Sequence, residues 1–295
     1  HLHAWVERLH KNIVQKNKTD HMWNKVAEHF FKNLNLISMY QTSESLKDIL
    51  IQRADIMERV LTTRSSIPLN YTFRKRDPHR KRIRLGVLAA HFLPQTETYA
   101  MLNDYKGLNK DKYEVVLLST NDAADSLTEE CKQHADKYVV LHGTPAEMVL
   151  QIRECDLDIL MLGTNVSAVT NIISFLALYR LARIQVTPNM GGATTGMRYC
   201  DYFIDIGTQK AKAFGHHNFK EKVIYFNLDS PTLELGNHNG DYSLNRKILG
   251  IPDDAIVYVS SSAVYKITPE LQESWAHIIK SVPKAHLLLC PFNPN

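Results

Sequence analysis

The spacing of apolar residues predicts a helical N-terminal region followed by a longer region of short buried strands. Over the first seventy residues, apolar side chains recur every three or four positions, which is the period of one helix face. Three helices fit this pattern, and the third starts at Ser45 with Asp48 as its capping-box partner. We expect the aromatic residues here to pack in the core rather than to bind a ligand. The three apolar stripes are Leu2, Trp5, Val6, Leu9, Ile13 and Val14; Trp23, Val26, Phe30 and Phe31; and Leu46, Ile49, Leu50, Ile56, Met57, Val60 and Leu61.

After Pro78 short apolar runs alternate with helical segments. One helix start is strong, because Thr144 is followed by Pro145 and, at the third position, by Glu147. Strands that alternate with helices predict an α/β fold with a doubly wound, parallel, Rossmann-like sheet. Such a sheet binds its ligands at the carboxyl ends of the strands. The predicted strands are 83–89, 113–118, 138–141, 159–162, 184–186 and 202–206.

A second α/β region follows a polar stretch, 229–242, that is typical of an interdomain linker. It opens with a short helix that ends at Gly250 and continues as one strand–helix–strand unit. Because one such unit does not close a Rossmann-like domain, we expect this domain to be incomplete. Its predicted elements are 244–249, 255–259, 268–282 and 285–289. The predicted domains are an α-helical domain, 1–75, a first Rossmann-like domain, 82–228, and the beginning of a second, 243–295.

Composition excludes a membrane span and favours the cytoplasm. No apolar run approaches the roughly 20 residues that a spanning helix needs. The first residues, HLHAWVERLH, lack the layout of a signal peptide and an initiator Met, so we expect the native start to be missing. The four cysteines lie far apart without a C-x-x-C pair, which is typical of a reduced, cytoplasmic protein.

The net charge is only +4, and the basic residues are scattered except for one run, Arg74 to Arg84. Such a run fits a nucleic-acid or membrane patch, but more often it is a solvated connector between domains. We therefore predict a connector and no nucleic-acid partner.

One stretch near the C-terminus joins a strand, a small polar turn, a lysine and a helix start. Ser260, Ser261 and Ser262 follow the strand, and Lys266 precedes the helix at Thr268. This arrangement presents backbone N–H groups and one cation to an anionic ligand. The alternative is an ordinary surface lysine, although a lysine near a helix N-terminus is unfavourable unless an anion lies there.

Two loops of the first sheet carry further candidate residues. The segment Gly191–Gly196, GGATTG, follows a strand, and its glycines and hydroxyls suit a phosphate or a sugar, although glycine-rich turns are more often only turns. The loop after the first strand carries His91 and Glu97, which suit acid–base work. A histidine in a loop is more often solvated.

Two patterns resemble metal sites, and neither predicts one. Asp156-Leu157-Asp158 matches a D-x-D motif that some sugar transferases use to hold a divalent cation. It leads into a strand at the end opposite the ligand side, so we interpret it as a turn. His216-His217 has no companion ligand at a recognisable spacing. We predict no metal.

The run IPDDAIVYVSSSAVYKITPELQESWAHIIKSVPKAHLLL resembles the start of the C-terminal catalytic domain of O-GlcNAc transferase. Shorter matches occur upstream in the same order, as RIRLGVL, DKYEVVLLST, ARIQ and GATTGMRYCDYFI. The last of these is most similar to the bacterial cytoplasmic N-glycosyltransferases that modify adhesins. Both groups belong to glycosyltransferase family 41, and the resemblance covers roughly Arg82 to the end.

The resemblance implies a GT-B fold, in which two Rossmann-like domains face each other across a cleft. It implies an inverting, metal-independent transfer of a sugar from a UDP-sugar to a protein side chain, Ser/Thr or Asn, with no cofactor. Lys266 falls on the family lysine that contacts the UDP diphosphate. The implied donor contacts are Lys266, Ser260, Ser261, Ser262, Gly191, Gly192, Ala193, Thr194 and Thr195, and the residues implied to face the acceptor are Gln95 or His91.

Several positions depart from the family pattern. Gln95 stands where the family has a histidine, Ala263 where O-GlcNAc transferase has a glutamine, Met190-Gly191-Gly192 in place of a Gly-x-Pro turn, and Asn227-Leu228 in place of a Pro-His pair. The later glycine- and threonine-rich UDP-binding segment is absent, so we expect these 295 residues alone to be inactive. Two alternatives stay open: a non-catalytic relative that binds a nucleotide sugar, and a GT-B transferase with a non-protein acceptor.

Overall fold

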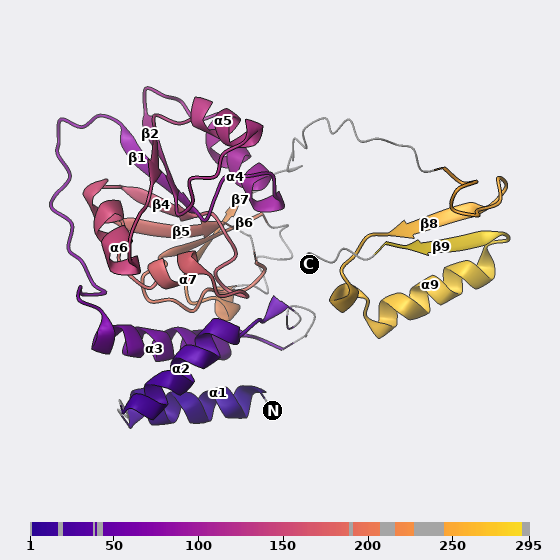
Figure 1. Ribbon diagram of the computed structural model, residues 1–295, viewed down its shortest axis with the longest axis horizontal. Coiled ribbons are helices and arrows are strands. Elements are labelled where there is room, and N and C mark those ends of the chain that lie inside the picture. The colour runs from indigo at the N-terminus through magenta and orange to yellow at the C-terminus, as the bar shows by residue number, and fades with distance from the viewer. Residues whose placement is uncertain are drawn as a thin grey trace. The chain divides into compact units, whose positions relative to one another are not determined.

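The computed structural model contains two compact units, formed by His1–Ile37 with Glu44–Glu234 and by Ser38–Ser43 with Leu235–Asn295. Each unit is described here by itself (Figure 1). The described residues are 2–16, 20–37, 39, 44–188, 191–206, 216–226 and 245–290. The predicted linker, 229–242, lies outside them, and the predicted domain boundaries stay predictions.

The first unit is built on a seven-stranded parallel sheet, as the alternating pattern predicts (Figure 1). The strand order is β3-β2-β1-β4-β5-β6-β7, so the order of the strands reverses between β1 and β4. Ligands bind such sheets at this switch point, outside the carboxyl ends of the strands. The strands are β1 (Ile83–Ala89), β2 (Tyr113–Ser119), β3 (Lys137–Val140), β4 (Ile159–Leu162), β5 (Ile184–Pro188), β6 (Tyr202–Ile206) and β7 (Lys222–Phe226).

Helices cover both faces of this sheet, because successive strand residues point to opposite sides. Val87 and Met161 belong to a core shared with α4 and α5, whereas Leu88 and Leu160 belong to a core shared with α6 and α7. The four helices are α4 (Thr96–Lys106), α5 (Ser126–Gln133), α6 (Pro145–Glu154) and α7 (Ile172–Leu176). The capping box predicted at Thr144 is present at the start of α6.

The N-terminal helices are α1 (Leu2–His10), a π-helical turn η1 (Lys11–Gln15), α2 (His21–Asn33) and α3 (Lys47–Arg64). Phe31 of α2 and Met57 of α3 enter the core that α6 and α7 share, so these helices pack on the sheet unit. Two predictions are wrong. Trp5 is 47% exposed because only its edge packs on Phe30. Ser45 does not cap α3, because the cap position falls on Leu46, which makes no side-chain capping bond.

The second unit is a strand–helix–strand element with two parallel strands that pair Ile256 with Ala285. Thr268 caps its helix, as predicted, by accepting from the Leu271 amide. The predicted helix 244–249 is replaced by turns over 246–250, and Leu244 lies outside the described residues. The elements are β8 (Ile256–Ser260), η4 (Val264–Lys266), α9 (Pro269–Ser281) and β9 (Ala285–Leu289).

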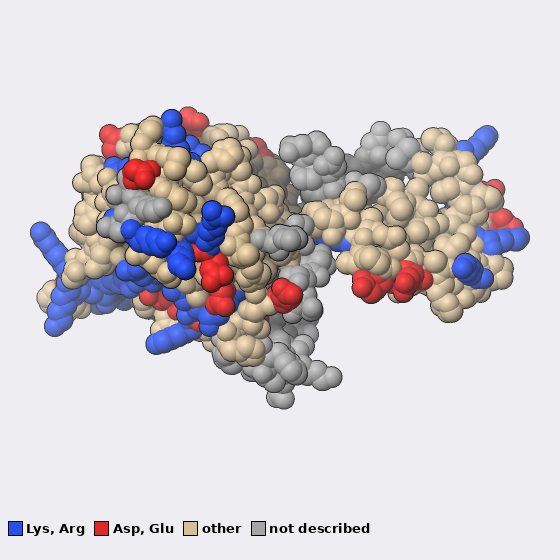
Figure 2. All heavy atoms as spheres, turned by 90° about the horizontal axis from the view of Figure 1, so that it is seen from below, with Lys and Arg blue, Asp and Glu red and all other residues tan. Residues whose placement is uncertain are grey.

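The basic run before β1 is a connector, but most of its arginines are ion-paired rather than solvated; these are Arg76, Arg80, Arg82 and Arg84. Asp158 is 8% exposed and lies just before β4. Its carboxylate accepts from Arg80 Nη2 at 2.6 Å, from Arg76 Nε at 3.3 Å and from the Arg84 amide at 2.9 Å. Arg80 also pairs with Asp156 at 2.7 Å. On the face drawn in Figure 2, acidic side chains likewise stand among the basic ones.

The two aspartates of the D-x-D segment therefore bind several arginines at the amino ends of the strands, and we call this cluster of ion pairs the arginine clamp. Its position agrees with the interpretation of the segment as a turn. Asp156 has a positive φ of 50° and pairs with Arg183 at 2.6 Å. These contacts neutralise both carboxylates and tie the connector to the sheet.

We predict that Asp158→Asn lowers the free energy of unfolding by about 3 kcal/mol, because it removes the largely buried carboxylate that the half-buried Arg76 and Arg80 share. Asp156→Asn is the matched control: its side chain is 43% exposed and asparagine tolerates the same backbone, so we expect at most about 1 kcal/mol. Urea denaturation measures both. Equal losses would contradict the central place of Asp158 in the clamp.

Candidate functional site

The candidate site in the first unit consists of the loops that follow β1, β4 and β5 at the carboxyl edge of the sheet. His91 and Gln95 lie in the first of these loops, and both are half-buried. His91 Nδ1 accepts weakly from the Leu93 amide at 3.4 Å, and Gln95 precedes α4 without a side-chain capping bond. Both residues therefore lie at the switch point, where the fold predicts a ligand.

Glu97, predicted as an acid–base candidate, has a structural role instead. Its carboxylate accepts from Thr164 Oγ1 at 2.9 and 3.0 Å and from the Asn165 amide at 2.9 Å. Thr164 and Asn165 belong to the loop after β4, so Glu97 joins the start of α4 to that loop. The prediction fails because sequence spacing does not show a partner sixty-seven residues away.

The two threonines of the GGATTG segment face the protein interior. Thr194 and Thr195 are each 1% exposed. Thr194 Oγ1 donates to Glu221 Oε2 at 2.5 Å, the Thr195 amide donates to Glu221 Oε1 at 2.8 Å, and the Thr195 hydroxyl also donates to that oxygen. Glu221 is itself only 6% exposed, and a buried carboxylate needs such donors. The expectation that these hydroxyls line a cleft is therefore not met, and Gly191, Gly192 and Ala193 are the more open part of the segment.

Gly196 is required by the packing of this segment. Its φ is +68°, a conformation that L residues rarely adopt, and a Cβ there would overlap the backbone carbonyl of Leu50 in α3. Gly192 has a similar φ of +56°, but a Cβ there would meet no atom within 4 Å. Gly196 therefore permits a close approach to α3, whereas Gly192 only permits a turn.

We predict that Gly196→Ala lowers the free energy of unfolding by at least about 3 kcal/mol, since left-handed strain of about 1–2 kcal/mol adds to the overlap with Leu50. Gly192→Ala should cost only the strain, about 1 kcal/mol. Urea midpoints at constant m-value compare the two variants. A loss of 1 kcal/mol or less for Gly196→Ala would show that the segment moves away from α3 easily.

The lysine turn of the second unit has the predicted local form. Ser260 ends β8, its carbonyl accepts from the Cys290 amide at 2.9 Å, and Ser261 and Ser262 lead to Ala263. Lys266 ends the short helix η4, two residues before the cap of α9. Its side chain is exposed, and among the described residues its ammonium has no hydrogen bond or ion pair. An exposed cation without a partner suits an anion, whereas the first amides of α9 are not free, because Pro269 has none and the Leu271 amide donates to Thr268.

The described residues contain no group of three or more His, Cys, Asp or Glu side chains that could hold a metal ion. His216 and His217 lie in the short helix η3 (His216–Asn218), and the His217 carbonyl accepts from Lys47 Nζ at 2.9 Å. None of the described helices is long and apolar enough to cross a membrane. Met190, Asn227 and Leu228 lie outside the described residues.

Three comparisons identify what the chain is similar to. Residues 243–295, which contain the lysine turn, match the family described as glycosyl transferase family 41. The chain is 23% identical over 225 residues to a probable UDP-N-acetylglucosamine–peptide N-acetylglucosaminyltransferase, SEC, of Arabidopsis thaliana, with 74% of this chain and 23% of the plant protein covered. An O-GlcNAc transferase mutant from Thermobaculum terrenum has a similar structure, with a TM-score of 0.61 and 20% identity over 98% of this chain and 52% of that one.

The predicted relationship to glycosyltransferase family 41 is confirmed. The α/β, GT-B-like fold is confirmed with it. The chain spans about half the length of the bacterial structure and about a quarter of the plant protein. The site residues that the family resemblance implies stay predictions, apart from what their positions in the structure show.

Sequence reasoning missed Glu221, Arg53 and Glu58, which hold the loops of this edge. Glu221 follows Lys220 in an unremarkable turn before β7, and no local pattern marks it. A signal existed for Arg53, because it lies four residues after Ile49 and four before Met57, on the predicted apolar stripe. A charged residue on a buried helix face indicates a specific partner.

Proposed function

We propose that this protein is a glycosyltransferase that transfers a sugar from a UDP-sugar to a protein side chain, Ser/Thr or Asn, with inversion and without a metal ion. The observation that carries the proposal is the lysine turn. The segment that matches family 41 holds an exposed lysine without a partner among the described residues, at the start of a helix. The names of the plant and bacterial relatives, a peptide N-acetylglucosaminyltransferase and an O-GlcNAc transferase, support a protein acceptor.

The chemistry requires stabilisation of the leaving UDP. The acceptor oxygen or nitrogen bonds to the anomeric carbon, the bond from that carbon to the diphosphate oxygen breaks, and UDP leaves with the electron pair. Negative charge therefore grows on the diphosphate, and a preorganised cation lowers the barrier by stabilising it. Lys266 supplies this charge, and the dipole of α9 adds partial positive charge at the N-terminus of that helix.

The acceptor proton must pass to a base as the new bond forms. His91 and Gln95 are the candidates for the acceptor side, and both lie at the switch point of the first sheet. Glu97 is excluded because Thr164 and Asn165 occupy its carboxylate. Of the two candidates, only His91 can take up a proton.

A second function, a non-catalytic relative that binds a nucleotide sugar, is favoured by one observation. The acidic and hydroxyl groups of the first unit's loops, Glu97, Thr194 and Thr195, are occupied by structural hydrogen bonds. UDP binding by the full-length protein, without transfer or hydrolysis of any UDP-sugar, would identify this function.

We predict that Lys266→Met in the full-length protein weakens UDP binding at least tenfold, about 1.4 kcal/mol, because a charge on the diphosphate loses its partner. Lys280→Met is the matched control, since it removes an exposed lysine from the other end of α9. Isothermal titration with UDP measures both affinities. Equal affinities in the two variants would show that Lys266 does not bind the donor.

We also predict that transfer by the full-length protein does not depend on a divalent cation. EDTA should leave the rate within about twofold of the untreated protein, because the protein itself supplies the charge for the leaving group. The assay follows UDP release with and without added Mg²⁺ or Mn²⁺. A tenfold loss in EDTA that either ion restores would contradict the metal-free mechanism.

A further inference from the structure

Helix α3 contacts the loops after both β4 and β5. In the view of Figure 1 it lies below α6 and α7, against the sheet unit. Arg53, on its buried face, is 2% exposed. Its Nη1 donates to the Ser167 carbonyl at 2.6 Å, and its Nη2 donates to Thr170 Oγ1 at 2.8 Å. A buried guanidinium must find acceptors, so these bonds hold the loop after β4 in place.

The loop after β4 is in turn bonded to the loop after β5. Ser167 Oγ donates to the Ala193 carbonyl at 3.0 Å. Three residues later Gly196 lies directly on the backbone of Leu50 in α3. The segment 193–196 therefore contacts α3 directly through Gly196 and indirectly through Ser167, whose loop is bonded to α3.

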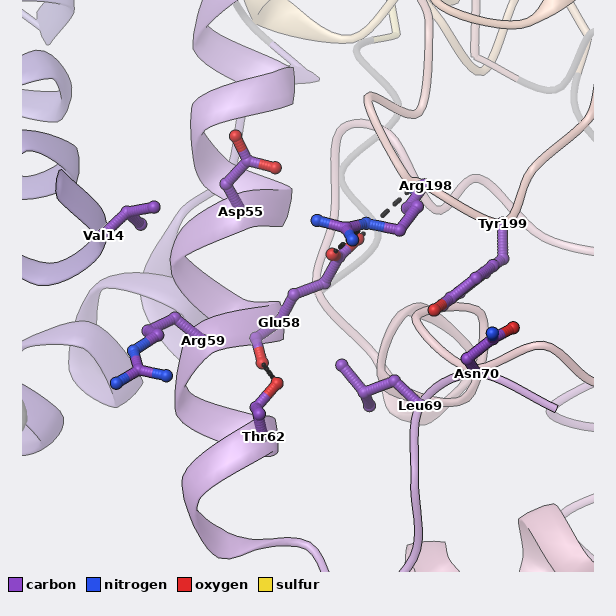
Figure 3. Close-up of a pocket in the computed structure, with 9 residues that line it drawn as sticks. All are labelled: Val14, Asp55, Glu58, Arg59, Thr62, Leu69, Asn70, Arg198 and Tyr199. Carbon is purple, nitrogen blue, oxygen red and sulfur yellow. Dashed lines mark hydrogen bonds and ion pairs between the residues drawn. The ribbon is translucent and has the colours of Figure 1, made fainter. Parts of the chain in front are cut away.

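A third contact joins α3 to the end of the same segment. Arg198 Nε donates to Glu58 Oε2 at 2.9 Å, and the Arg198 amide donates to Glu58 Oε1 at 3.3 Å. Figure 3 shows these two side chains directed toward each other across a hollow of about 410 Å³ between α3 and the 198–199 segment. The Glu58 side chain is 6% exposed, whereas that of Arg198 is 63% exposed. The helix thus provides a buried carboxylate, and the loop provides an exposed arginine.

The Glu58–Arg198 pair joins a buried carboxylate to an exposed guanidinium. Burial raises the pKa of the Glu58 carboxyl, although the charges of Arg198 and Lys220 act in the opposite direction. The net environment therefore disfavours the charged carboxylate, as for many buried ion pairs whose desolvation exceeds their attraction. A pair of this kind fixes a conformation more than it stabilises the fold.

We propose that α3 sets the conformation of the 191–198 loop, with Arg53 and Glu58 as positioning residues for transfer. The effect on the loop stands on the contacts above, and the effect on transfer rests on the proposed function. The N-terminal helices are then part of the catalytic unit. Glu221 and Lys220, whose Nζ donates to the Gly196 carbonyl at 2.8 Å, hold the opposite side of the loop.

Hydrogen exchange of the full-length protein tests this role with Glu58→Gln. We expect amides 194–199 to exchange at least about tenfold faster, because the Arg198 amide loses an ionised acceptor, while the sheet amides and the urea midpoint stay unchanged. Glu28→Gln is the control: it breaks another carboxylate–arginine pair, between Glu28 of α2 and Arg64 at the C-terminal end of α3. It should leave amides 194–199 unchanged.

Arg198→Met removes the same contact from the exposed side and should reproduce the loop effect, while the charge of Lys220 remains to favour the Glu58 carboxylate. Unchanged exchange of amides 194–199 in both Glu58→Gln and Arg198→Met would overturn the proposal. An equal rise throughout the sheet would also overturn it, since that outcome marks a general loss of stability.

Kinetics of the same full-length variants separate this proposal from the proposed function. Glu58→Gln should lower kcat at least about tenfold with the KM for the UDP-sugar unchanged, because a misplaced loop affects the reacting geometry. Faster exchange with unchanged kcat would overturn the loop's part in transfer while confirming that α3 holds it. If the wild type shows no transfer, the proposed function fails, and the exchange result alone decides whether α3 holds the loop.

Discussion

The buried guanidinium of Arg53 is the contact on which the carboxyl edge of the sheet depends. A guanidinium inside a helix–sheet interface is expensive unless acceptors surround it, so the loop after β4 must bring its carbonyls to α3. That loop bonds the segment after β5 through Ser167, and Glu58 and Glu221 fix the two sides of the same segment. Buried charges thus specify the loop geometry that apolar packing alone leaves open.

Buried carboxylates hold the chain at both edges of the sheet, with arginines as partners at the amino ends and with hydroxyls and amides at the carboxyl ends. At the amino ends, Asp158 gathers arginines from the basic connector and from the segment before β5, which neutralises charges the sequence concentrates there. At the carboxyl ends, Glu97 and Glu221 accept hydrogen bonds from hydroxyls and amides. The basic run is consequently part of the arginine clamp. Its composition alone fits a nucleic-acid surface, but the ion pairs argue against that interpretation.

Hydrophobic runs predicted strands β1, β4 and β6 to the residue, and local capping chemistry predicted the start of α6. These features depend on neighbours in the chain. The strand β7 was missed although Val223–Phe226 is an apolar run, and the structure shows it half exposed at the edge of the sheet. The fates of Glu97, Thr194 and Thr195 were not predictable for a different reason, since each depends on a partner at least twenty-six residues away.

The two units differ in which polar side chains are free of structural hydrogen bonds and can bind a ligand. In the first unit, the threonines and Glu97 hold loops through hydrogen bonds. In the proposed mechanism, a ligand there meets backbone groups of 191–193 and the side chains of His91 and Gln95. In the second unit, Lys266 keeps its charge uncompensated among the described residues. A transferase without a metal must take the cation for its leaving group from the chain, and only an uncommitted cation can serve. The lysine turn therefore carries the donor chemistry in the proposed mechanism, while α3 and Glu221 give the first unit its shape.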